Sequence, residues 1–124
     1  MATIKEILEY QKNFDIKHGW YWGETTEEKK LGHLQYAVMA MTGELGEFAN
    51  ALKKAIREFN AKKTIPKEVE TDGKIIDLES KLREEITDVF IYTVKVALAL
   101  GMDLEKEYFD KMKKNEVKHE KFLV

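Results

Sequence analysis

The sequence of 124 residues contains no cysteine and only one proline. Without cysteine, the chain has no disulfide framework, no thiolate zinc site and no cysteine nucleophile. Its seven glycines and single proline, set against abundant Lys, Glu, Leu and Ala, favour long uninterrupted helices over a sandwich with many turns. We therefore expect an all-α protein.

The chain also lacks an excess of charge of one sign, because 21 Lys and Arg stand against 23 Asp and Glu. This balance leaves no overall basic footprint, so we expect no nucleic acid polymer as a partner. No stretch approaches the roughly 18 apolar residues of a membrane span, and Lys5, Glu6 and Glu9 stand where a signal peptide would be apolar. We expect a cytoplasmic protein with no membrane partner. Its length suits one domain over residues 1–124.

The spacing of apolar residues predicts two helices in the first half of the chain. The first covers residues 4–18, with Thr3 beginning a capping box and Gly19 as the stop. The second begins after Thr25 and Thr26 and reaches about residue 62. Its apolar positions recur every three or four residues, which defines one helical stripe. The stripe consists of Leu31, Leu34, Val38, Met41, Leu45, Phe48, Leu52, Ile56 and Phe59.

A charged segment without periodicity, residues 63–77, interrupts the helical pattern. Pro66 and the turn signal Thr71-Asp72-Gly73 predict an irregular connection there. Periodicity resumes over residues 78–100, and Asp103 is placed to cap a last helix. The predicted architecture is a bundle of four to five helices around one core. Helices this long in so short a chain carry more apolar surface than one bundle covers, so we expect at least a homodimer.

Two pairs of carboxylates fall at the edges of the apolar stripes. At about 100° per residue, Glu44 lies at the flank of the stripe of the second helix, and Glu47 lies one step further round on the same side. The same construction places Glu85, Asp88 and Tyr92 along one edge of the third helix. If the two helices pack through their stripes, the acidic edges face each other across a groove.

Four carboxylates in one groove repel each other strongly unless a cation binds between them. Hard oxygen ligands suit Mg²⁺, with Mn²⁺ as a possible substitute. Because Mg²⁺ is typically held by a few carboxylates together with substrate phosphates, the groove implies a phosphate compound as substrate. The alternative is that both pairs are solvated flanks, as is usual in a chain with 35% charged residues.

The segments Gly43-Glu44-Leu45-Gly46-Glu47-Phe48 and Leu82-Arg83-Glu84-Glu85-Ile86-Thr87-Asp88-Val89 resemble the paired motifs of a known superfamily. It is the MazG-like all-α nucleoside triphosphate pyrophosphohydrolases, which carry E-x-x-E on one helix and E-x-x-D on the next. The similarity covers roughly residues 31–118. It implies hydrolysis of (d)NTP to (d)NMP and pyrophosphate, in nucleotide-pool housecleaning, and it allows a homodimer or a dimer of dimers. By this resemblance Glu44, Glu47, Glu85 and Asp88 hold Mg²⁺, and one of them also orients or deprotonates the attacking water.

The same resemblance implies the substrate contacts. Lys111 and Asn115 match the phosphate and sugar contacts that relatives carry on the last helix, and Tyr92 is placed to pack against base or sugar. Some relatives stack a tryptophan on the base, which makes Trp20 and Trp22 candidates for that role. The structural alternatives are a solvated Lys111, a Tyr92 that caps the core, and tryptophans that cover the end of the bundle.

The chain departs from the family pattern at two places. The stretch between Glu47 and Glu85 is longer than usual, and Lys118 stands where many relatives have an arginine, which removes a bidentate phosphate contact. Two other classes of protein are alternatives. A di-iron bundle needs two E-x-x-H pairs, but the chain offers only Glu116 to His119. The other class is a non-catalytic helical oligomerisation or interaction module with solvated acidic edges.

Overall fold

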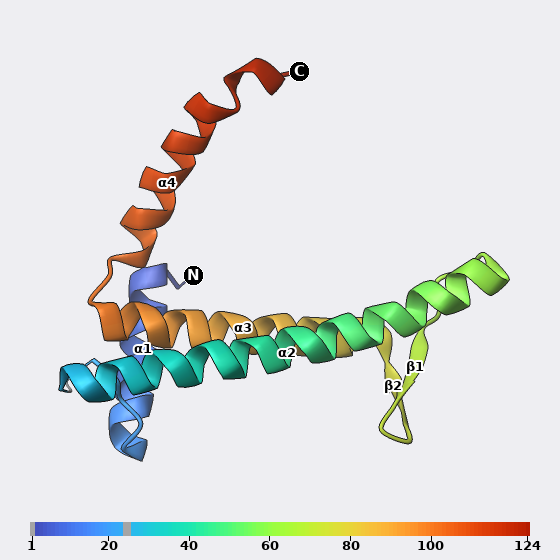
Figure 1. Ribbon diagram of the computed structural model, residues 1–124, viewed down its shortest axis with the longest axis horizontal. Helices are drawn as coiled ribbons and strands as arrows, with labels where there is room; N and C mark the ends of the chain where they lie inside the picture. Colours follow the sequence, from blue (N-terminus) through green and yellow to red (C-terminus); the bar gives the residue numbers. More distant parts are fainter. Residues whose placement is uncertain (1, 24–25) are drawn as a thin grey trace. The chain divides into compact units, whose positions relative to one another are not determined.

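The computed structural model describes residues 2–23 and 26–124, and most of them are helical (Figure 1). This confirms the prediction of a mainly helical fold. The elements, in chain order, are α1 (Ile4–His18), α2 (Glu27–Lys62), β1 (Glu68–Thr71), β2 (Lys74–Asp77), α3 (Leu78–Leu100), α4 (Leu104–Lys118) and a short 3₁₀ helix (Glu120–Phe122).

These elements form two compact units. Unit 1 consists of Met1–His33 and Val94–Val124, and unit 2 consists of Leu34–Thr93. Both α2 and α3 contribute residues to each unit. All four carboxylates of the two acidic motifs belong to unit 2. Among the described residues, no helix is long and apolar enough to cross a membrane.

The helix ends follow local signals. Thr3 Oγ1 accepts a hydrogen bond from the Glu6 N–H (3.2 Å), and Gly19 ends α1 in the left-handed region at φ 72°. Thr26 Oγ1 accepts from the Lys29 N–H (3.2 Å) at the start of α2, whereas the predicted cap Thr25 lies outside the described residues. The predicted ranges 4–18 and 78–100 are confirmed, and the Asp103 side chain caps α4 as predicted.

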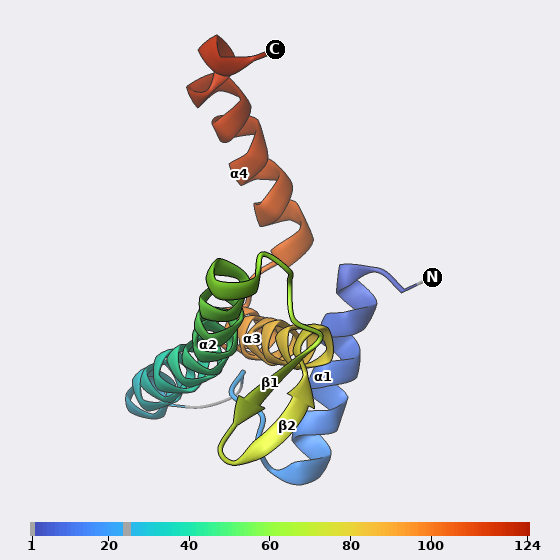
Figure 2. The same cartoon turned by 90° about the vertical axis from the view of Figure 1, so that its right-hand side faces the viewer.

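The prediction of an irregular connection is wrong over residues 68–77. Strands β1 and β2 form an antiparallel hairpin, in which Val69 pairs with Ile76 (Figure 2). Asp72 and Gly73 both have positive φ (52° and 76°), as a two-residue hairpin turn requires. The hairpin is held because Val69 packs into a hydrophobic cluster with residues of both helices. That cluster contains Ala51, Ala55, Val69 and Leu78, with Ile76 and Leu82 packed against it.

In unit 2, only part of the predicted apolar stripes is buried, and Leu78 and Leu82 of α3 pack in the cluster with Ala51 and Ala55 of α2. On α2 the buried residues are Ala37, Ala51 and Ala55. The stripe lies about a quarter turn away and is 40–64% exposed at Val38, Leu45, Leu52, Ile56 and Phe59. The helices also meet along the edge of α2 that carries alanines and Glu44, where Glu85 and Asp88 of α3 approach Glu44.

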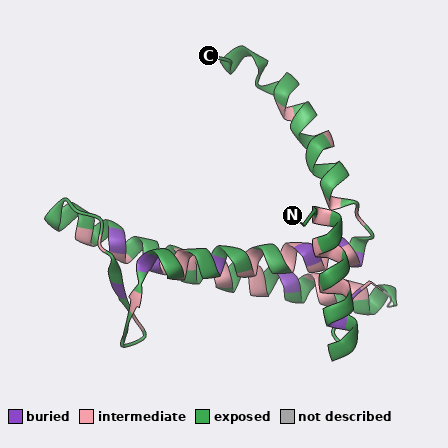
Figure 3. Cartoon of the chain, turned by 180° about the vertical axis from the view of Figure 1, so that it is seen from behind, coloured by how far each residue is buried: buried purple, intermediate pink, exposed green. Residues whose placement is uncertain are grey.

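On α3 the burial of the stripe changes along the helix, and Leu78 at its start is buried. Ile86 and Phe90 are exposed, whereas the adjacent Glu85 is only 3% exposed. In Figure 3 the buried positions of α2 and α3 are isolated patches, and α4 has none. Acidic side chains therefore lie between the helices in addition to the hydrophobic cluster, and part of the apolar surface of unit 2 is uncovered.

Candidate metal site in unit 2

Three of the four predicted metal ligands come together between α2 and α3. One carboxylate oxygen each of Glu44, Glu85 and Asp88 lies within 4.8 Å of the other two. Glu85 and Asp88 share an edge of α3 because they are three residues apart, and Glu44 stands on the alanine-lined edge of α2. Glu85 is buried, while Glu44 and Asp88 are half-buried. The cluster is thus partly shielded from water.

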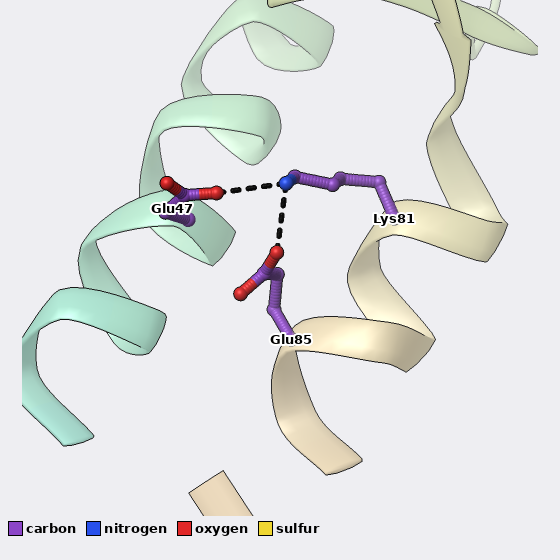
Figure 4. Close-up of polar contacts among 3 residues, drawn as sticks. All are labelled: Glu47, Lys81 and Glu85. Atoms are coloured by element: carbon purple, nitrogen blue, oxygen red, sulfur yellow. Dashed lines mark hydrogen bonds and ion pairs between the residues drawn. The ribbon is translucent and has the colours of Figure 1, made fainter. Parts of the chain in front are cut away.

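The fourth predicted ligand, Glu47, points to a lysine. Lys81 Nζ lies 2.7 Å from Glu47 Oε2 and 2.7 Å from Glu85 Oε1, so it bridges the two helices (Figure 4). The Lys81 side chain is 19% exposed, against 51% for Glu47. Sequence reasoning missed Lys81. Its position one helical turn before Glu85 was the available signal, but its contact with Glu47 joins residues 34 positions apart.

The acidic cluster carries an unbalanced oxygen. Lys81 pairs with Glu85 Oε1, but Oε2 is enclosed and has no hydrogen-bond donor while Glu44 is ionised. A shared proton with Glu85, burial and the neighbouring negative charges together raise the pKa of Glu44 to about 7, and the hydrogen bond with Glu85 contributes most. The same hydrogen bond lowers the pKa of Glu85, and Lys81 adds to that effect. A proton on Glu44 therefore relieves the cluster near neutral pH.

A divalent cation would relieve the cluster in the same way. Every atom that the cluster offers to a metal ion is a carboxylate oxygen, and nitrogen and sulfur ligands are absent from this set. Such a set fits Mg²⁺ or Mn²⁺ better than a softer metal. The buried, unpaired Glu85 Oε2 is an additional sign of fit, because a buried carboxylate oxygen without a donor is costly unless a cation or a proton accompanies it.

Two tyrosines stand beside the carboxylates. The rings of Tyr36 on α2 and Tyr92 on α3 have centroids 6.4 Å apart and are tilted by 59°. Burial raises the pKa of Tyr92, a hydrogen bond with Tyr36 raises it further, and the charges of Glu44 and Asp88 act in the same direction. Tyr92 therefore lies close to the acids, as predicted from its place on the same edge of α3 as Glu85 and Asp88. Tyr36 was not predicted.

The two candidate tryptophans belong to unit 1 and differ in exposure. Trp22 is 6% exposed, because its ring stacks on His33 at 5.3 Å and Lys95 Nζ lies 4.6 Å from its centroid. Trp20 is 54% exposed and stacks beside His18 at 4.8 Å. Of the two, Trp20 has the more accessible ring.

Lys95 also connects Trp22 to a buried acid. Asp15 is 1% exposed, accepts a hydrogen bond from Gln11 Nε2 (3.0 Å) and lies 3.8 Å from Lys95 Nζ. This group holds the aromatic loop between α1 and the end of α3 in unit 1.

The residues expected on the last helix lie on α4. Lys111 is exposed, and Asn115 is half-buried with its Nδ2 donating to Met112 Sδ at 3.7 Å. They belong to unit 1, whereas the carboxylates belong to unit 2.

Comparison of this chain with protein-family models and with curated proteins finds no match. The acidic cluster, its surroundings and the resemblance of the two motifs are therefore the features that indicate a function.

Proposed function

We propose that this chain is a Mg²⁺-dependent nucleoside triphosphate pyrophosphohydrolase of the MazG-like all-α type. It would hydrolyse (d)NTP to (d)NMP and pyrophosphate, as an enzyme of nucleotide-pool housecleaning. The observation that supports this most is the approach of Glu44, Glu85 and Asp88 within 4.8 Å, since they come from the two helices that carry E-x-x-E and E-x-x-D.

In this proposal Glu44, Glu85 and Asp88 hold the cation. Mg²⁺, when bound, supplies positive charge to the phosphate oxygens and so makes the α phosphorus easier to attack. Water adds to the α phosphorus, the bond to the oxygen bridging the β phosphorus breaks, and pyrophosphate leaves with the electron pair. One of the acids accepts the proton of the water.

Lys81 and Glu47 act together in this scheme. Lys81 leaves Glu47 and forms a charge-assisted hydrogen bond to an oxygen of the leaving pyrophosphate. Glu47 is then free to join the other acids or to orient the water. Tyr92 remains the proposed substrate contact beside the acids. For Lys111, Asn115, Trp20 and Trp22, which belong to unit 1, the role of substrate contact depends on the resemblance alone.

The alternative, a non-catalytic module with solvated acidic edges, explains fewer observations. A solvated edge predicts exposed and ordinary carboxylates. Glu85 is instead 3% exposed, and the pKa of Glu44 is raised to about 7. A site that needs a cation or a proton accounts for both values.

We further propose that the exposed stripes of unit 2 bind a second copy. The segments of α2 and α3 in unit 2 are antiparallel (Figure 1), and on each helix an exposed stripe residue directly follows a buried one, as Leu52 follows Ala51 and Ile86 follows Glu85. The stripes therefore fall on one face of the helix pair. This face consists of Val38, Leu45, Leu52, Ile56, Phe59, Ile86 and Phe90.

The size of this face suits a homodimer. Each of its seven side chains is about half exposed, so complete burial gains about 1 kcal/mol per side chain. Two copies would gain about 14 kcal/mol, which is comparable to the roughly 4–15 kcal/mol that association costs. Flanking contacts would add to this gain, and a dimer of dimers is a further possibility within the same family pattern.

The test is a panel of ribo- and deoxyribonucleoside triphosphates with Mg²⁺, in which monophosphate plus pyrophosphate is separated from diphosphate plus phosphate. We expect pyrophosphate release by wild type, and a loss of about 100-fold or more in Glu85→Gln and Asp88→Asn. Glu84→Gln is the matched control, because Glu84 is the exposed neighbour of Glu85. Pyrophosphate release from no triphosphate, or equal rates in all variants, would refute the proposal.

A further inference from the structure

The acidic cluster has different chemistry at its two ends. On α2, Tyr36 lies about two turns before Glu44, and on α3, Tyr92 lies about one turn after Asp88. Because the helices are antiparallel here, these positions fall at the same end, where the two rings meet. The opposite end holds the ammonium group of Lys81 (Figure 4).

The distances along the helices match a bound nucleotide. At about 1.5 Å per residue, Tyr92 is about 6 Å beyond Asp88 along α3, and Lys81 is about 6 Å before Glu85. A triphosphate whose α phosphate meets a cation held by the acids would extend its pyrophosphate in one direction and its nucleoside in the other. The ammonium attracts the pyrophosphate, and the uncharged aromatic end suits the nucleoside.

Tyr36 is accessible at this end. It is 57% exposed, although its ring is paired with that of Tyr92. Its ring meets that of Tyr92, which lies one helical turn after Asp88 on α3, and this places Tyr36 next to the cluster. A ring so placed has surface left for a sugar or a base.

We infer that Tyr36 is a further substrate-binding residue, which packs against the nucleoside of the triphosphate whose leaving pyrophosphate lies against Lys81. This inference depends on the proposed function and adds to it a direction for the substrate. A tyrosine ring contacts any base or sugar by its face, so Tyr36 indicates a nucleoside as the class of ligand and no particular base.

The test uses the two products as separate probes. With Mg²⁺ present, calorimetry would measure binding of inorganic pyrophosphate and of the monophosphate derived from the triphosphate that wild type hydrolyses fastest. We expect Tyr36→Ala to weaken monophosphate binding about tenfold, to raise KM with little change in kcat, and to leave pyrophosphate binding within about twofold. Tyr36→Phe keeps the ring and should stay within about threefold of wild type for both probes.

Tyr10→Ala is the control, because Tyr10 is a 74% exposed tyrosine of α1 in unit 1. Tyr36→Leu replaces Tyr36→Ala if the latter melts early. Unchanged monophosphate binding, or equal losses for both probes, would overturn the inference while an active wild type upholds the proposed function. An inactive wild type would overturn both.

Discussion

Replacement of Lys81 by methionine tests the electrostatics of unit 2 directly. Lys81→Met keeps an unbranched chain but removes the ammonium that balances Glu47 and Glu85. Removing one partner of a buried ion pair costs about 3–5 kcal/mol. The Glu85 side chain is 4% exposed but that of Glu47 is 51% exposed, so we expect Lys81→Met to lower the free energy of unfolding by about 2–3 kcal/mol. At about 4 °C per kcal/mol for a chain of this length, Tm should fall by about 8–12 °C.

The assay is thermal unfolding followed by circular dichroism at pH 7.5, without metal and with Mg²⁺. Mg²⁺ should raise Tm more in Lys81→Met than in wild type, because the variant has lost its own counter-ion. Arg83→Met is the matched control. Arg83 pairs with Glu79 at the same spacing on α3, but both side chains are more than 70% exposed, so its loss should cost less than about 1 kcal/mol. If Lys81→Met and Arg83→Met have the same Tm, Lys81 does not stabilise the cluster.

Other perturbations have equally definite outcomes. The raised pKa of Glu44 gives stability that is complete below its ordinary value of 4.5 and lost as pH rises through about 7. Metal-free Tm should therefore fall between pH 5 and 8 in wild type but less in Glu44→Gln, and parallel curves would disprove the shared proton. Trp22→Ala should lose about 3 kcal/mol in denaturant titrations and Trp20→Ala less than about 1 kcal/mol, whereas similar losses would contradict their different burial. In analytical ultracentrifugation Leu52→Asp should be monomeric while Ile75→Asp, altered on the hairpin, should dimerise like wild type; a monomeric wild type would eliminate the proposed dimer face.

The helices could be predicted from the sequence because their signals are local. The hydroxyl of Thr3 and the left-handed Gly19 act within a few residues of the helix ends they define. The same holds for Asp103 at the start of α4. Likewise, the three-residue spacing of Glu85 and Asp88 places both on one edge of α3 whatever that edge contacts.

The hairpin was missed although its turn was seen. Asp72-Gly73 is a local signal, but strand pairing also depended on Val69 entering a cluster with Ala51 and Ala55. Those contacts join distant parts of the chain. A segment without helical periodicity gave no sign of them.

Which edge of α2 is buried was also beyond the sequence. Periodicity locates an apolar stripe, and burial of that stripe is the usual outcome, but here only part of the stripe is buried, and alanines and acids share the contact between α2 and α3. Only the tertiary structure brings Glu44 to Glu85 and Lys81 to Glu47. The sequence by itself determined the helices and the acidic pairs they carry, since both depend on neighbours one turn away. The tertiary structure decided which pairs meet and what balances their charge, because those contacts depend on close packing between residues more than thirty positions apart.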